Sequence, residues 1–173
     1  RIFFFFFLYM YLSFVIIGCE GIAQRHAEQI ARFGILAAVC DIIPERADEL
    51  AAIYNAKPYY SVDELLKNEK ELLAVSICTP NGLHASHSIK ALEAGNHVLC
   101  EKPLCLNADD GRLMVSVANK AGKKLFVVKQ NRYNPPVTFL KDLIVSGKLG
   151  SIYSFQINGF WNRPSEYYRD WKG

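Results

Sequence analysis

The first three quarters of the chain alternate between short apolar runs and longer stretches whose apolar residues recur at helical spacing. Apolar runs of this length, bounded by glycine and polar residues, are typical of buried strands. We expect strands at residues 13–17, 35–40, 58–60, 72–78, 98–100 and 125–129. We expect helices at residues 21–32, 45–54, 62–67, 83–94 and 108–121. Strands that alternate with amphipathic helices predict an α/β fold with a doubly wound parallel sheet.

The chain begins with an unusual apolar run, IFFFFFLYMYLSFVII at residues 2–17. This run resembles the core of a signal peptide, and the sequence that ends in Cys19 loosely matches a lipoprotein cleavage site. The run is shorter than a typical membrane span, and cleavage before Cys19 would remove the first predicted strand. We therefore interpret residues 1–11 as an anomalous start, truncated or misread, that leads into this strand. The alternative is an exported lipoprotein.

Composition and charge limit the classes of partner. Hydrophobic residues make up 51% of the 173 residues and charged residues 21%, which is typical of globular proteins. The net charge of +3 is too small to indicate a nucleic-acid partner, and the sequence contains no block of lysines and arginines. We expect a small-molecule partner, and neither a nucleic acid nor a membrane.

The five cysteines favour a reducing compartment. Their number is odd, and their spacing matches no zinc motif. Four of them lie in or at the ends of predicted strands, namely Cys19, Cys40, Cys78 and Cys100. We expect reduced, mostly buried thiols, no metal site and a cytoplasmic protein.

The turn after the first predicted strand resembles a dinucleotide-binding glycine turn. In the pattern G-x-G-x-x-G/A, Gly18 fills the first position and Ala23 the third. Such a turn lets the backbone approach a pyrophosphate, and the helix N-terminus favours its charge. Glu20 occupies the middle position, where its side chain and charge oppose a pyrophosphate and weaken binding. The dinucleotide contacts that we expect here are Gly18, Gly21, Ile22 and Ala23.

An acidic residue follows the second predicted strand. Asp41 lies about twenty residues after the glycine turn, where a carboxylate accepts hydrogen bonds from the ribose hydroxyls of adenosine. A carboxylate at this place repels a 2′-phosphate, so Asp41 favours NAD over NADP. The alternative is that Asp41 caps the turn before Pro44.

The segment Thr79-Pro80-Asn81 follows the fourth predicted strand. Because parallel α/β sheets bind ligands at the carboxyl ends of their strands, we expect this loop to face the cofactor. Asn81 is alternatively a cap of the helix that follows. His84 and His87 lie within that helix, and their position alone is typical of packing or surface histidines.

The segment Glu101-Lys102-Pro103-Leu104 follows the strand at residues 98–100, so Lys102 also lies at the carboxyl end of a buried strand. Pro103 fixes its own φ and keeps Lys102 out of helical geometry. Lys102 is therefore a candidate functional group. The alternative is a surface pair of Glu101 and Lys102 before a turn.

Several motifs together resemble one enzyme family. Thr79-Pro80-Asn81, His84 and the segment ALEAGNHVLCEKPL at residues 91–104 are similar to the cofactor-domain core of the glucose-fructose oxidoreductase, inositol dehydrogenase and rhizopine catabolism (Gfo/Idh/MocA) family. The resemblance extends from about Val15 to the last residue. The segments KQNRYNPP at residues 129–136 and FWNR at residues 160–163 resemble the branch that contains nucleotide-sugar 3-dehydrogenases of surface polysaccharide synthesis.

The resemblance implies a Rossmann-type cofactor domain at residues 1–128 and the start of an α/β substrate domain at residues 129–173. In the second domain we expect a helix at residues 136–146 and a strand at residues 151–160. The family's second catalytic element, an Asp and a His on a later helix, has no counterpart in this sequence. We therefore interpret the chain as a C-terminally truncated fragment that is inactive alone, from a complete protein that forms a homo-oligomer.

The resemblance also implies hydride transfer from a carbon of a sugar or nucleotide sugar to NAD. Lys102 would lie beside the nicotinamide and the sugar hydroxyl and assist proton transfer, and Glu101 would orient the cofactor or the lysine. Further implied cofactor contacts are Thr79, Pro80, Asn81, His84 and Gln130. Implied substrate contacts are Lys102, Arg132, Tyr133, Asn134, Trp161 and Arg163. The alternative function, which Glu20 suggests, is a non-catalytic module that binds a dinucleotide or a sugar phosphate.

Overall fold

The computed structural model describes residues 12–70, 72–162 and 165. The chain forms two compact units, of which the first ends at Val128 and the second begins at Lys129. The anomalous residues 1–11 and the predicted substrate contact Arg163 lie outside the described residues.

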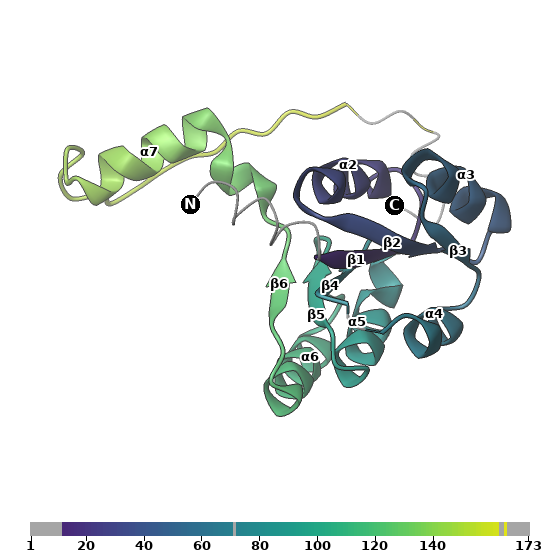
Figure 1. Cartoon of the computed structure of the whole chain (residues 1–173). Coiled ribbons are helices and arrows are strands. Elements are labelled where there is room, and N and C mark those ends of the chain that lie inside the picture. The colour runs from purple at the N-terminus through teal and green to yellow at the C-terminus, as the bar shows by residue number, and fades with distance from the viewer. Residues whose placement is uncertain (1–11, 71, 163–164, 166–173) are drawn as a thin grey trace, which may run out of the picture. The chain divides into compact units, whose positions relative to one another are not determined.

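The first unit is built on a six-stranded parallel sheet (Figure 1). Its strands are β1 (Ser13–Ile17), β2 (Ile35–Cys40), β3 (Lys57–Tyr59), β4 (Ala74–Ile77), β5 (His97–Cys100) and β6 (Leu125–Val127). The strand order is β3-β2-β1-β4-β5-β6, and each neighbouring pair is parallel. The chain therefore changes direction across the sheet between β1 and β4, which is the topology of the Rossmann fold. The predicted doubly wound sheet is confirmed.

Helices cover both faces of this sheet (Figure 1). On one face lie α2 (Ala23–Phe33) and α3 (Pro44–Tyr54). On the other face lie α4 (Val62–Asn68), α5 (His84–Glu93) and α6 (Ala108–Ala121). A short 3₁₀ helix at Asn81–Leu83 leads into α5. The helices predicted for this unit are all present, with ends that differ slightly from those expected.

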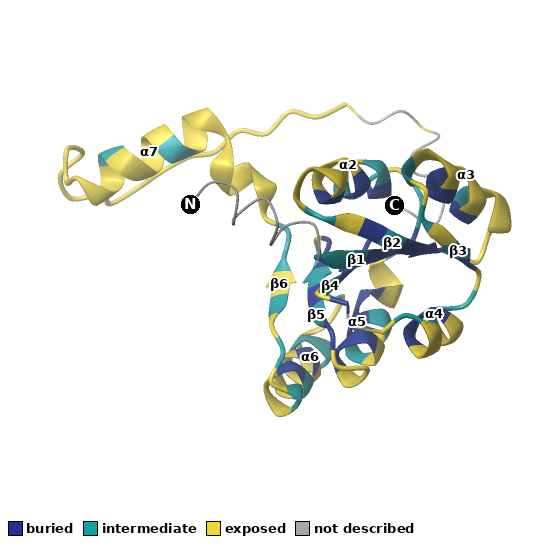
Figure 2. Cartoon of the chain, in the orientation of Figure 1, coloured by how far each residue is buried: buried dark blue, intermediate teal, exposed yellow. Residues whose placement is uncertain are grey.

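Side chains of the strands alternate between two cores. Val15 and Ile17 pack in the core beneath α4, α5 and α6, whereas Ile16 packs in the core beneath α2 and α3. Figure 2 shows the buried residues on both sides of the sheet. Cys100 at the end of β5 belongs to the first of these cores. Because successive strand residues point to opposite faces, Glu101 is directed toward the face that α2 covers.

The second unit contains a 3₁₀ helix at Gln130–Tyr133 and the helix α7 (Pro135–Val145). α7 confirms the helix predicted for residues 136–146. The strand predicted for residues 151–160 is wrong, because the described residues after Val127 form no strand and this segment is exposed. A strand needs a second strand to complete its ladder of hydrogen bonds, and no described segment of this unit provides one.

The described helices include none that is long and apolar enough to cross a membrane. Within the same described part, no three His, Cys, Asp or Glu side chains gather into a group that could hold a metal ion. All five cysteines are free thiols. Burial raises the pKa of the Cys19 thiol to about 12 and that of the Cys40 thiol to about 12. Both thiols are therefore protonated and poorly reactive at neutral pH.

Candidate active site

The carboxyl ends of four strands bring predicted site residues to one edge of the sheet. Gly18 follows β1, Asp41 follows β2 and Glu101 follows β5, while Thr79 lies just beyond the end of β4. The backbone N–H of Gly18 donates to the carbonyl of Cys40 at 2.8 Å, which joins the ends of β1 and β2. This edge includes the point between β1 and β4 where the strand order reverses, and open α/β sheets bind ligands at such a point.

The glycine turn has little room at its first position. Gly18 has a φ of +91°, and a Cβ placed on it would lie 2.6 Å from the carbonyl carbon of Cys78 and 2.6 Å from the amide nitrogen of Thr79. Gly21 also has a positive φ, +51°, but a Cβ there would meet nothing within 4 Å. Ala23 is fully buried, as expected where a small residue lets the helix pack closely on the sheet. Gly18 therefore fits the backbone cradle that a dinucleotide requires.

Glu20 in the middle of this turn is paired with a residue that the sequence motifs did not indicate. Arg46 Nη1, from the first turn of α3, donates to Glu20 Oε2 at 3.3 Å. The side chains of Arg46 and Glu20 are 38% and 33% exposed, so this ion pair contributes only about 0–1 kcal/mol. The arginine nevertheless offsets part of the repulsion that the carboxylate would exert on a pyrophosphate. Beside the turn, Ile22 packs partly buried against the core beneath α2 and α3.

Asp41 uses both carboxylate oxygens to hold the local backbone. Its Oδ2 accepts from the N–H of Cys19 at 2.8 Å, and its Oδ1 accepts from the N–H of Ile43 at 2.9 Å. The bond to Ile43 shows that the alternative role, a cap of the turn before Pro44, is present in the structure. Each carboxylate oxygen retains a second lone pair, so this role is compatible with acceptance of a ribose hydroxyl.

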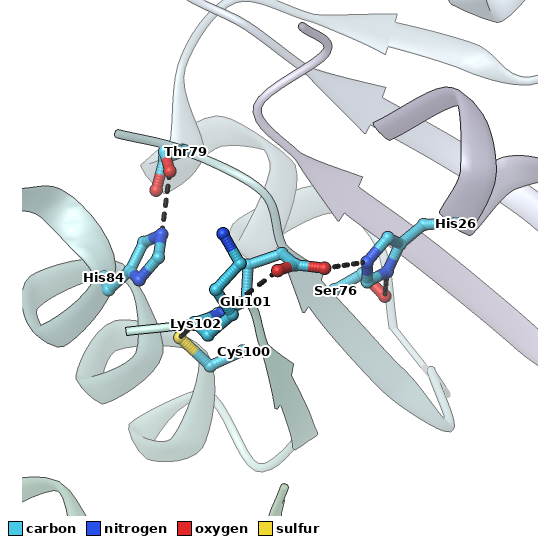
Figure 3. Close-up of polar contacts among 7 residues, drawn as sticks. All are labelled: His26, Ser76, Thr79, His84, Cys100, Glu101 and Lys102. Atoms are coloured by element: carbon cyan, nitrogen blue, oxygen red, sulfur yellow. Dashed lines mark hydrogen bonds and ion pairs between the residues drawn. The ribbon is translucent and has the colours of Figure 1, made fainter. Parts of the chain in front are cut away.

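His84 connects two loops at this edge. Its Nε2 lies 2.8 Å from the carbonyl oxygen of Thr79, and its Nδ1 lies 2.5 Å from the carbonyl oxygen of Pro103 (Figure 3 shows the contact with Thr79). His84 is 1% exposed, and both of its ring nitrogens face backbone carbonyl oxygens. In this structure His84 thus bridges the loops after β4 and β5, as a packing histidine does.

The rest of the loop after β4 stays accessible. Pro80 is half-buried and Asn81 is exposed. α5 begins without a hydrogen bond from any side-chain cap, so the alternative role of Asn81 as the cap of this helix is wrong. His87 Nδ1 lies 3.3 Å from Thr79 Oγ1, which supports the loop from the side of α5.

Glu101 and Lys102 lie in contrasting surroundings. Glu101 is 6% exposed, whereas Lys102 is an exposed residue. The backbone N–H of Lys102 donates to Glu101 Oε2 at 3.1 Å, and the peptide bond between Lys102 and Pro103 is cis. The alternative of a surface Glu–Lys pair is wrong, because the Glu101 carboxylate is buried. Lys102 remains available at the edge of the sheet.

The partner of Glu101 is His26, which no sequence motif indicated. His26 Nε2, on α2, lies 2.9 Å from Glu101 Oε1, and its Nδ1 lies 3.2 Å from Ser76 Oγ (Figure 3). Burial works to raise the pKa of Glu101, but the hydrogen bonds that it accepts from His26 and from the backbone N–H of Lys102 hold that pKa below its ordinary value. The positive charge of the Lys102 side chain acts in the same direction. Glu101 is therefore a carboxylate at neutral pH.

The other predicted contacts belong to the second unit. Gln130, Arg132 and Tyr133 lie in its 3₁₀ helix, and Asn134 immediately precedes α7. Trp161 is exposed. The roles of these residues stay predictions.

The sequence matches one protein family over most of the first unit. Residues 12–129 match the family GFO_IDH_MocA, described as an oxidoreductase family with an NAD-binding Rossmann fold. Among curated proteins, the chain is 32% identical over 145 residues to glucose-6-phosphate 3-dehydrogenase of Bacillus subtilis (strain 168). This match covers 83% of the chain and 41% of that protein.

Two solved structures are similar to nearly the whole chain. One is the WlbA dehydrogenase of Chromobacterium violaceum in complex with NADH and UDP-GlcNAcA, with 39% identity, a TM-score of 0.87, and coverage of 91% of this chain and 46% of that one. The other is the WlbA dehydrogenase of Bordetella pertussis with the same ligands, with 37% identity, a TM-score of 0.87, and coverage of 91% and 49%. The chain thus spans less than half the length of the relatives that it matches.

Proposed function

The chain belongs to the GFO_IDH_MocA oxidoreductase family, and from this membership we propose that the complete protein oxidises a hydroxyl-bearing carbon of a nucleotide sugar with NAD as the hydride acceptor. The observation that carries the proposal is the position of Lys102, exposed at the sheet edge where Gly18 and Asp41 also lie. The NADH and UDP-GlcNAcA in the two similar WlbA dehydrogenases support the choice of ligands.

The proposed chemistry separates a hydride and a proton. Oxidation of a secondary alcohol breaks the C–H bond with its electron pair and releases the hydroxyl proton. NAD supplies the hydride acceptor when it is bound, and we assign acceptance of the proton to the Lys102 amine. The backbone at Gly18, the carboxylate of Asp41 and the loop at Thr79 would bind and orient the cofactor.

We assign substrate binding mainly to the second unit. The proposed contacts there are Arg132, Tyr133, Asn134, Trp161 and Arg163, with Gln130 as a further cofactor contact. Arginine suits the phosphates of a nucleotide sugar, because its planar group forms paired hydrogen bonds with phosphate oxygens.

Since the chain spans less than half the length of its relatives, we expect the 173-residue chain to bind NAD without turnover. We expect the complete protein to be a homo-oligomer in the cytoplasm, where its free thiols stay reduced.

An absorbance assay for NADH tests this function. The complete protein is incubated with NAD and either a UDP-linked hexose derivative or the same sugar without its nucleotide. NADH should appear with the nucleotide sugar. NADH from the unlinked sugar alone would contradict the nucleotide-sugar assignment. Tight NAD binding with no reduction by any sugar would favour the alternative, a non-catalytic binding module.

The 173-residue chain should bind NAD at least about 10-fold more tightly than NADP, because Asp41 repels a 2′-phosphate. Asp41→Asn removes the charge, and with it one of the two acceptors of backbone N–H groups, with little change of size, so the preference for NAD should narrow. Calorimetric titration of both cofactors measures this difference. Glu93→Gln, the same kind of change on an exposed residue at the end of α5, should leave the preference unaltered. Equal affinities in the unmodified chain would remove the ribose assignment.

Glu20→Gly should tighten NAD binding by about 5-fold, because the turn loses both a side chain and a charge near the pyrophosphate. The gain is modest because Arg46 already offsets part of the charge. Glu20→Gln keeps the side chain without its charge and separates the two effects. NAD titration of the three proteins provides the measurement. Identical affinities would mean that Glu20 faces away from the cofactor and that Gly21 makes the close approach.

A further inference from the structure

Three side chains form a hydrogen-bonded chain behind the proposed site (Figure 3). Ser76 Oγ lies 3.2 Å from Nδ1 of His26, and His26 Nε2 lies 2.9 Å from Oε1 of Glu101. The chain ends at the backbone of Lys102, whose N–H donates to Glu101 Oε2 at 3.1 Å. The side chains of His26 and Glu101 are only 10% and 8% exposed. This chain therefore links β4, α2 and the loop after β5 away from solvent.

The polarity of these contacts follows from the carboxylate. An ionised Glu101 only accepts hydrogen bonds, so His26 Nε2 must be the donor to Oε1. In a neutral ring Nδ1 then accepts from the Ser76 hydroxyl, and in a charged ring Nδ1 donates to the same hydroxyl. Because a hydroxyl can rotate to donate or accept, both contacts of His26 persist in either protonation state.

The arrangement leaves Glu101 little freedom. One carboxylate oxygen is held by His26 and the other holds the backbone N–H of Lys102. A buried acceptor that loses its donor is destabilised, so Glu101 depends on His26 to stay in this position. His26 lies on α2, the helix that begins just after the glycine turn. Through Glu101, His26 thereby connects the helix that follows the glycine turn with the backbone of Lys102.

On the basis of the proposed function, we propose that His26 is a positioning residue for the reaction. It touches neither substrate nor cofactor. It holds Glu101, which in turn fixes the backbone of Lys102 at the edge of the sheet, and Ser76 orients the imidazole ring. A purely structural His26 would stabilise the whole unit equally and would have no particular effect at Lys102.

Amide hydrogen exchange of the 173-residue chain, followed residue by residue by NMR, separates these two roles. In His26→Leu, which removes the donor, exchange at the N–H of Lys102 should become about 10-fold faster. In His26→Gln, the amide N–H of the new side chain can still reach Glu101. The exchange rate at the N–H of Lys102 should therefore stay close to that of the unmodified chain. The amides of Cys78 and Val98 report on the sheet itself, because they donate within it. Their exchange should change by less than about 2-fold.

His97→Gln is the matched control, because His97 lies at the opposite end of β5 and accepts from the N–H of Lys124. It should leave exchange at Lys102 unchanged. Unchanged exchange at Lys102 in His26→Leu would overturn the proposal, as would a rise that the amides of Cys78 and Val98 share. If His26→Leu does not fold, Ser76→Ala replaces it, and a rise of about 3-fold confined to Lys102 is then expected. Its absence would also overturn the proposal.

Steady-state kinetics of the complete protein provide the second readout. His26→Leu should lower kcat by about 10-fold with KM for NAD changed by less than about 2-fold, and His26→Gln should restore kcat to within about 3-fold. An unchanged kcat in His26→Leu would contradict the positioning role. If none of the nucleotide sugars tested lets the unmodified protein reduce NAD, the proposed function fails by itself. The exchange data then still decide whether His26 positions Lys102.

Discussion

Replacement of Lys102 by methionine should lower kcat of the complete protein by about 100-fold or more while the affinity for NAD changes little. Methionine keeps the length and apolar stem of the side chain but cannot accept the hydroxyl proton. Because Lys102 is exposed and Glu101 is held by His26, the substitution should leave the fold intact. Steady-state rates with a nucleotide sugar, together with NAD titration, measure the two effects separately.

Lys102→Arg identifies which property of the lysine matters. Arginine keeps the positive charge but does not give up its proton at the working pH. A role in proton transfer predicts that both variants are impaired, whereas a purely electrostatic role predicts partial recovery with arginine. A methionine variant with nearly normal kcat would remove Lys102 from the chemistry and leave it as a surface residue after β5.

The second large effect is expected at the first glycine of the turn. Gly18→Ala should lower the free energy of unfolding of the 173-residue chain by about 2–4 kcal/mol and should abolish measurable NAD binding. A Cβ there would lie 2.6 Å from backbone atoms of Cys78 and Thr79, and backbone cannot move aside as a flexible side chain does. The φ of +91° adds strain for any residue other than glycine. Urea unfolding followed by circular dichroism measures the loss.

Gly21→Ala is the matched control for this prediction. Its φ of +51° is less demanding, and a Cβ on it meets no atom within 4 Å. The cost should therefore be about 1–2 kcal/mol from the left-handed backbone alone. Equal destabilisation by the two alanines would show that backbone conformation, and not the contact with the end of β4, limits the turn.

The order of strands and helices was predictable because each buried parallel strand is an apolar run between polar or glycine-rich turns. The ends of strands were less predictable, because a neighbouring strand sets them. The apolar run at residues 72–78 is longer than β4, which pairs with β1 only over residues 74–77. The segment at residues 151–160 shows the same limit. Its sequence pattern indicates a strand, but the pattern does not provide the neighbouring strand with which it would pair.

The position of candidate residues at the edge of the sheet was predictable where a residue closely follows a strand, as Asp41 and Lys102 do, because the carboxyl ends of parallel strands share one edge. Contacts between elements distant in the sequence were not predictable in this way. Arg46 reaches Glu20 in the glycine turn from α3, and His26 reaches Glu101 across 75 positions of the sequence.

A weaker signal for His26 is present in the pattern of α2. The buried residues of this helix are Ala23, Ala27 and Ile30, and His26 lies on the same stripe by helical spacing. A histidine on an apolar stripe indicates a polar partner across the interface. Only the folded structure identifies that partner.

The central place of β1 has a consequence for the synthesis of the protein. Among the described residues β1 is the first strand, yet it lies between β2 and β4. On the ribosome β2 emerges soon after β1, whereas β4 follows only after two further helices and β3. Until then, one side of β1 presents unpaired backbone groups among apolar side chains, the kind of surface that joins other unfinished chains. A ribosome that pauses before residue 74 therefore holds an aggregation-prone intermediate, which chaperone binding to the nascent chain would protect.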